Sequence, residues 1–181
     1  MKKLQLAVVL GMVMASGSVF AADQGHGTVN FKGEIIDAPC SITADTVEQT
    51  VDLGQVSSAA LKAGGKSSPK AFSIKLEDCD VSSLTKKTVT ATFTGKGASF
   101  DTSSSLLALA GSAAGAGIAI TDDNSSVIKL GTASTAYTFT NDSTEAELRY
   151  SAYLQGAADN TTTPIVAGEF TSVANYTLAY Q

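Results

Sequence analysis

The chain has 181 residues, of which 44% are hydrophobic and 16% are charged, and its formal net charge is −5. This length is sufficient for one domain with a real core, and the hydrophobic content excludes a disordered chain. Acidic residues outnumber basic ones, and beyond the N-terminus the only basic cluster is Lys86–Lys87. Nucleic acid is therefore not an expected partner, because binding it requires a concentrated positive field.

The first 21 residues have the pattern of a secretory signal peptide. Lys2 and Lys3 give a charged start, an apolar run follows, and Val19 and Ala21 supply the branched and small residues that favour cleavage after Ala21. The alternative is an uncleaved membrane anchor, but the apolar run is shorter than the ~20 residues that span a bilayer. We expect residues 1–21 to be removed on export, which also removes two lysines.

Past this segment, hydrophobic and polar residues alternate and helical periodicity is scarce. Period-two patterning rich in β-branched and aromatic residues predicts half-buried strands. These are expected within 29–35, 51–56, 72–76, 89–93, 118–120, 127–130, 137–139, 148–154 and 170–180. Segments 62–69 and 110–117 are expected to be loops, and the second lacks the lysine and hydroxyl residue that close a phosphate-binding loop. Many short strands separated by turn residues predict an all-β sandwich.

Cys40 and Cys79 are the only cysteines, and both lie in the part expected to be exported. A disulfide is therefore the default, and a loop of this size would stabilise the fold by about 4 kcal/mol. A metal or redox pair is the alternative. It is disfavoured because the chain has no CxxC motif and its single histidine, His26, is far from both cysteines in the sequence.

No combination of residues points to catalysis. His26 lies in a glycine-flanked tail, and no cysteine remains as a nucleophile once the pair is bridged. The run 122–124 is interpreted as a turn, because the residues after it lack the spaced carboxylates of a calcium loop. Glu145 and Glu147 are expected on a solvent-exposed face of a sheet. We expect neither an enzyme nor a metal or cofactor site.

The two ends of the chain carry the strongest signal. Residues 22–27 are polar and lead into the alternating run 28–36, in which Gly33 occupies the apolar face. A glycine there packs nothing, and it suits a backbone that must lie close to another surface. At the C-terminus, hydrophobic residues alternate up to Tyr180, and no later segment of the given chain would cover that strand. The alternative is an ordinary first and last strand of a complete sandwich.

These ends resemble the pilins of the chaperone–usher pathway, in particular the major shaft subunits of type 1-like and P-like fimbriae. The resemblance rests on segment 27–40 (GTVNFKGEIIDAPC), the cysteine pair, Gly168 fourteenth from the end, and the closing Tyr180-Gln181. Pro39 departs from the Ala or Asn that the family often has before the first cysteine. The resemblance covers the chain from residue 22 onward.

The resemblance implies an incomplete immunoglobulin-like β-sandwich, residues 37–181, that lacks its last strand. Residues 22–36 would be a donor strand for the groove of a neighbouring identical subunit, as in the strand addition known for pilins. The groove-filling positions would be Val29, Phe31, Gly33 and Ile35. The strand lining the groove, which a periplasmic chaperone would hold first, would carry Gly168, Ala174, Tyr176, Leu178, Tyr180 and Gln181.

The resemblance also implies export through the periplasm, exchange at an outer-membrane usher, and a head-to-tail fibre on the cell surface that supports adhesion. A minor adaptor subunit would share both ends of the chain. A tip adhesin would carry an additional receptor-binding domain and no donor extension. A secreted β-sandwich enzyme or binding protein remains the alternative outside this pathway.

Overall fold

The computed structural model describes residues 27–140 and 143–181. The predicted signal peptide, His26 and the first part of the predicted extension, 22–26, lie outside the described residues. The chain divides after Ile35 into two units, which we describe separately.

The described residues of the second unit, Ile36–Gln181, form β-strands and one 3₁₀ helix. In chain order the elements are β1 (Ser41–Ile42), η1 (Ser58–Gly64), β2 (Lys70–Glu77), β3 (Thr88–Gly95), β4 (Leu106–Ala108), β5 (Ala110–Gly111), β6 (Ala116–Asp122), β7 (Tyr137–Thr138), β8 (Ala146–Gly156), β9 (Phe170–Thr171) and β10 (Ala174–Tyr180).

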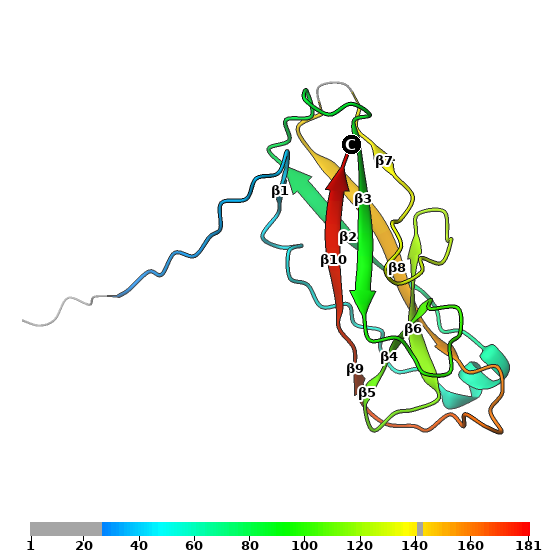
Figure 1. Cartoon of the computed structure of the whole chain (residues 1–181). Coiled ribbons are helices and arrows are strands. Elements are labelled where there is room, and N and C mark those ends of the chain that lie inside the picture. The colour runs from blue at the N-terminus through cyan, green and yellow to red at the C-terminus, as the bar shows by residue number, and fades with distance from the viewer. Residues whose placement is uncertain (1–26, 141–142) are drawn as a thin grey trace, which may run out of the picture. The chain divides into compact units, whose positions relative to one another are not determined.

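Two antiparallel sheets form the two layers of a sandwich. The larger sheet has the strand order β1-β2-β8-β6-β4, and the smaller has the order β10-β3-β7. Figure 1 shows β10 and β3 in front of β2 and β8, and the short pair β5–β9 at the lower end. The all-β sandwich predicted from the alternating pattern is confirmed.

The core lies between the inward faces of the two sheets. Ile74 of β2, Val89 of β3 and Leu148 of β8 are 0–3% exposed, and the rings of Phe93 and Tyr150 meet edge to face at 5.0 Å between centroids. The far end of β8 is buried on its outer face as well, because Tyr153 packs against Ala119 of β6 and Leu106 of β4. Burial of such large side chains stabilises the fold by about 1.5–3 kcal/mol each.

Most of the predicted strands are present. The expected runs at 72–76, 89–93, 118–120, 137–139 and 148–154 correspond to β2, β3, β6, β7 and β8. The final run is divided, because Ser172 and Val173 separate β9 from β10. The two predicted loops are also partly structured: η1 extends into 62–69, and β5 and the start of β6 occupy parts of 110–117.

The strands predicted at 51–56 and 127–130 are wrong, because neither segment forms one. Leu53 and Val56 instead pack beside Leu61, and Ile128 is buried in the main core. These side chains pack into the core from irregular backbone. An apolar pattern indicates which side chains are buried, but a strand also needs a neighbouring strand for its hydrogen bonds.

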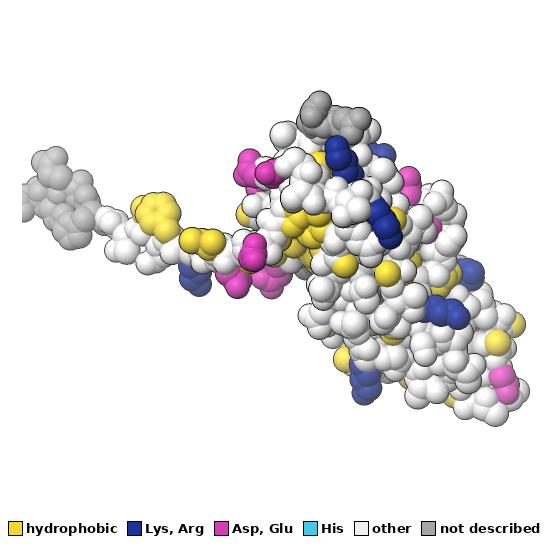
Figure 2. All heavy atoms as spheres, turned by 45° about the horizontal axis from the view of Figure 1, so that its top comes forward, with side chains coloured by type: hydrophobic (Ala, Val, Ile, Leu, Met, Phe, Trp, Pro, Cys, Tyr) yellow, Lys and Arg dark blue, Asp and Glu magenta, His cyan; other side chains and the backbone are white. Residues whose placement is uncertain are grey.

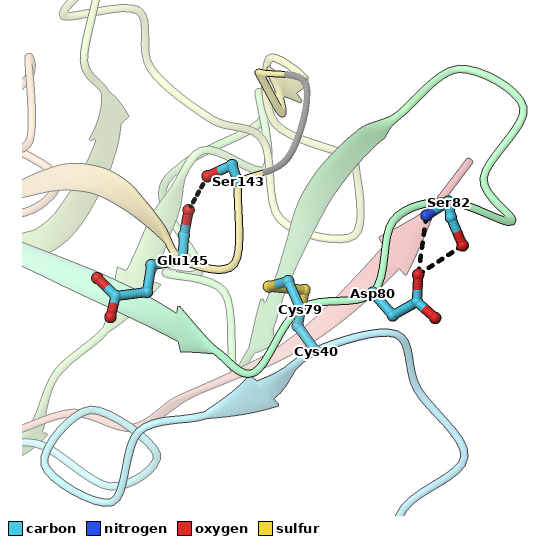
Figure 3. The surroundings of a disulfide bond; sticks show 6 residues. All are labelled: Cys40, Cys79, Asp80, Ser82, Ser143 and Glu145. Atoms are coloured by element: carbon cyan, nitrogen blue, oxygen red, sulfur yellow. Dashed lines mark hydrogen bonds between the residues drawn. A yellow bond between two sulfur atoms is a disulfide. The ribbon is translucent and has the colours of Figure 1, made fainter.

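The predicted disulfide joins Cys40, just before β1, to Cys79, just after β2. Both half-cystines are buried, at 2% and 9% exposure. Figure 3 shows the bridge beside the Asp80–Ser82 turn and the loop of Ser143. Two backbone bonds reinforce the connection, from Asp80 N to Pro39 O at 2.8 Å and from Cys79 N to Thr144 O at 3.0 Å. The bridge therefore ties β1, the short first strand, to the end of β2.

A single carboxylate organises the loop between β3 and β4. Asp101 accepts hydrogen bonds from the backbone N–H groups of Ser103, Ser105 and Leu106 at 2.6–2.9 Å, and from two serine hydroxyls. Partial burial raises the pKa of Asp101, but the bonds from Ser103, Ser105 and Leu106 outweigh it and lower that pKa to about 2.

Asp101→Asn is therefore expected to lower the free energy of unfolding by about 1–2 kcal/mol at pH 7, after allowance for solvent screening. Because the folded-state pKa lies below the unfolded value, this stabilisation is present above about pH 4. It is lost as the pH falls through about 2. Urea unfolding at pH 7 and at low pH measures the difference. The exposed Asp123→Asn is the control, and a deficit that does not shrink in acid would contradict this role of the charge.

Candidate strand-accepting groove

Strand β10 lies at an open edge of the smaller sheet. It pairs with β3 along its whole length, from Ala174 opposite Gly95 to Tyr180 opposite Val89. No other strand in the described part of the chain pairs with its far side. An edge of this length is a template for another strand.

The register shows which backbone groups of β10 face that open side. Gln181 and Thr88 exchange both backbone hydrogen bonds, at 2.9 and 3.0 Å. Hydrogen-bonded pairs alternate in an antiparallel ladder, so every second residue from Gln181 backwards points its N–H and C=O at β3. The residues between them point these groups away from β3. They are Ala174, Tyr176, Leu178 and Tyr180.

The same four residues also turn their side chains toward the core, but these side chains are only partly buried. Leu178 and Tyr180 of β10 are only half-buried, whereas their β3 partners Ala91 and Val89 are 0% exposed. Tyr176 is likewise half-buried beside Phe93, which is 2% exposed. The two rows share one face of one sheet, so the difference arises from their position: β3 has neighbours on both sides and β10 has one. The sandwich is incomplete beside β10.

The opposite wall of this open side belongs to the larger sheet. Its edge strand is β1, where Ile42 is half-buried, and Phe72 of β2 is half-buried behind it. The Tyr176 hydroxyl donates a hydrogen bond of 3.3 Å to the Thr46 carbonyl, which places the turn after β1 across from β10. Half-buried hydrophobic side chains from both sheets therefore flank the open side between β1 and β10, which is the candidate groove. Figure 2 shows hydrophobic side chains gathered on this upper part of the domain.

The first unit presents the complementary pattern. Among its described residues, 27–35, none belongs to a strand, and Val29, Phe31 and Ile35 are 74%, 92% and 103% exposed. A side chain at Gly33 would meet no atom within 4 Å. Nothing within this unit therefore requires a glycine there, and three large hydrophobic side chains are left in water at alternate positions.

The structure places the remaining predicted groove residues differently. Gln181 directly follows β10, and its side-chain oxygen accepts a 3.0 Å hydrogen bond from Lys86. Gly168 lies outside β10, in a bend before β9. A Cβ atom at Gly168 would collide with Ser112 and Ala113, so this glycine serves a close contact with the segment after β5.

The candidate groove is lined mainly by partly buried hydrophobic side chains. Burial raises the pKa of Tyr176 and of Tyr180. Glu147 lies elsewhere, on the outer face of β8, where it pairs with Arg149 at 2.9 Å. In residues 27–140 and 143–181, no group of acidic, histidine or cysteine side chains is arranged to hold a metal, and no helix is long and apolar enough to cross a membrane. The arrangement is suited to binding an extended hydrophobic segment.

Sequence reasoning missed the wall opposite β10. Ile42 and Phe72 show a weak signal, because Ile42 lies two residues after Cys40 and Phe72 begins the strand predicted at 72–76. Thr46 carries no signal at all, because its part in the groove depends on a backbone carbonyl that any residue would supply.

Comparison with known proteins agrees with this arrangement. The model of the fimbrial protein family matches residues 29–181. The chain belongs to the fimbrial protein family. It is 52% identical to the fimbria A protein of Serratia marcescens, with 100% of this chain and 99% of that protein aligned. It is 48% identical to the major MR/P fimbria protein of Proteus mirabilis, with the same coverage.

Solved structures place this fimbrial protein among pilus subunits. A chaperone–usher pilus structure superposes with a TM-score of 0.76 at 33% identity, covering 87% of this chain and 97% of the other. The P pilus rod subunit PapA gives a TM-score of 0.70 at 30% identity, covering 80% and 100%. The expected incomplete immunoglobulin-like fold is confirmed.

Proposed function

We propose that this fimbrial protein is the major structural subunit of a fimbrial shaft and polymerises by donating residues 22–36 to the groove of an identical copy. The observation that carries the proposal is the difference in burial between the inward-facing side chains of β10 and those of its paired strand β3. The β10 row is half-buried where the β3 row is fully buried, as expected where one strand is missing. The exposed row of Val29, Phe31 and Ile35 has the alternation that such a strand requires.

Each buried large side chain of the donor would contribute about 1.5–3 kcal/mol. Each ladder bond to the outward backbone groups of β10 would add about 0.5–1.5 kcal/mol, before the ordering cost is subtracted. Gly33, at the alternate position between Phe31 and Ile35, would let the donor backbone approach closely. The contact is head-to-tail and does not close on itself, so repetition generates a filament.

The proposal includes the route to the surface. Residues 1–21 would direct export and be removed. An unfilled groove exposes hydrophobic surface and a free strand edge, both aggregation hazards. A periplasmic chaperone would therefore cover it until an outer-membrane usher exchanges the chaperone strand for the donor. The names of the relatives, a major fimbria protein and a rod subunit, support a shaft role in a surface fimbria over an adaptor role. The protein would act in adhesion as a scaffold, without catalysis.

The proposal is tested by two substitutions on adjacent residues of the donor. Phe31→Asp puts a charge on the groove-facing row and is expected to lower the yield of surface fibres about a hundredfold or more, because a buried unpaired charge costs several kcal/mol. Lys32→Asp puts the same charge on the other face and is expected to change the yield less than about twofold. Sheared surface material, run on denaturing gels with and without boiling in acid, measures polymer and monomer. Equal yields would contradict the donor role.

A further inference from the structure

One hydrogen bond joins the two sheets across their open side. The hydroxyl of Tyr176 in the smaller sheet reaches the carbonyl of Thr46 in the turn that follows β1 of the larger sheet, at 3.3 Å. Its ring packs beside Phe93, with the centroids 6.3 Å apart. Among the described residues, no other β10 side chain has a hydrogen bond recorded to the larger sheet.

The Thr46 turn is itself fixed to β2. The Thr46 hydroxyl accepts the backbone N–H of Lys75 at 3.1 Å, and Thr43 N donates to the carbonyl of the same lysine at 3.0 Å. Gln49 donates its side-chain amide both to the Thr46 carbonyl at 3.2 Å and to Ser73 O at 2.9 Å. Thr46 is consequently only 5% exposed.

Tyr176 is placed to act as a spacer between the two layers. Sheets in a sandwich lie about 10 Å apart. In the described part of the chain, no strand pairs with the open side of β10 to set this distance. The wall opposite β10 is irregular, because no strand is assigned between Ile42 and Lys70. Near Tyr176, the hydrogen bond to the Thr46 carbonyl is therefore a direct link between the two groove walls.

We propose that Tyr176 is a positioning residue for strand donation: its bond to the Thr46 carbonyl holds the groove at the width of a donor strand before any strand is bound. The inference rests on the proposed function. A site that is already ordered binds more tightly, because the cost of ordering it is not deducted from the binding energy. Tyr176 thus acts on the affinity of the groove through the Thr46 turn.

The test uses the processed full-length chain and a fluorescent peptide of residues 27–36 as the probe. Tyr176→Phe removes only the hydroxyl and is expected to weaken peptide binding about tenfold, as for the loss of one hydrogen bond. Tyr153→Phe is the control, because it removes a hydroxyl from the outer face of β8, away from the groove. It is expected to change the affinity less than about twofold. Fluorescence anisotropy measures the affinity.

Hydrogen exchange supplies a second readout that does not depend on peptide binding. In the unfilled chain, Tyr176→Phe is expected to accelerate exchange at Thr46, Val47 and Lys75, while Tyr153→Phe leaves it unchanged. With peptide bound, wild type and variant are expected to exchange alike, because the added strand then holds the walls. Gln49→Met, which frees the same carbonyl from the β2 side, is expected to reproduce the effect.

Unchanged affinity and exchange in Tyr176→Phe would overturn the proposal. Tighter or faster peptide binding by Tyr176→Phe would overturn it too, because the hydrogen bond between Tyr176 and Thr46 would then have to break before a strand could bind. Absence of peptide binding by the wild type would instead count against the proposed function. In that case, faster hydrogen exchange in Tyr176→Phe would still show that Tyr176 stabilises the Thr46 turn.

Discussion

Deletion of residues 22–36 is expected to abolish fibre formation and to leave a folded subunit that still accepts a strand. Every strand of both sheets lies between Ser41 and Tyr180, so the truncation keeps them all. It removes Val29, Phe31 and Ile35, the exposed hydrophobic row that we assign to the neighbour's groove. Electron microscopy and size-exclusion chromatography of the processed chain measure the loss. Deletion of 22–26 alone is the control and is expected to leave fibres.

The truncated subunit should also act as a chain terminator. It retains β10 with its open edge and can therefore receive a donor strand, but it has none to give. In head-to-tail assembly each such subunit ends a fibre, so one truncated chain in ten is expected to limit fibres to on the order of ten subunits. Fibres from the truncated chain alone, or fibre lengths insensitive to the admixture, would refute the assignment of the donor.

Replacement of both Cys40 and Cys79 by alanine is expected to lower the free energy of unfolding by about 4 kcal/mol. The bridge spans a sequence separation of 39 residues, and its loss releases that loop in the unfolded chain. Both positions are buried, and β1 is only two residues long, so the bridge is the covalent part of what holds the first edge of the larger sheet. The yield of exported subunit should fall with it, because many domains have only 5–15 kcal/mol of stability in total.

Urea unfolding of the monomeric, unfilled subunit measures this effect, with the wild type reduced by dithiothreitol as the control. The reduced wild type and the double variant are expected to unfold at similar urea concentrations. Equal stability of the oxidised wild type and the double variant would show that the bridge is dispensable.

The sequence determined the features that depend on local alternation and on residue type. Strands β2, β3, β8 and β10 each bury one face, so their apolar residues recur at every second position and predict them directly. The disulfide followed from the only two cysteines in a chain that we predict to be exported. The resemblance to pilins rested on such local motifs at the two ends.

Tertiary structure decided which alternating segments gain neighbours. Strand β1 and strand β4 are too short for a periodic signal and exist because β2 and β6 lie beside them. Segments 51–56 and 127–130 have suitable side chains but form no continuous ladder. The second makes a single isolated bridge, between Val127 and Thr121 of β6, and both segments remain irregular. The rows of β3 and β10 look equivalent in sequence. Only the order β10-β3-β7 leaves one of them at an edge, half-buried, because burial of a strand depends on the strands beside it and not on its own residues.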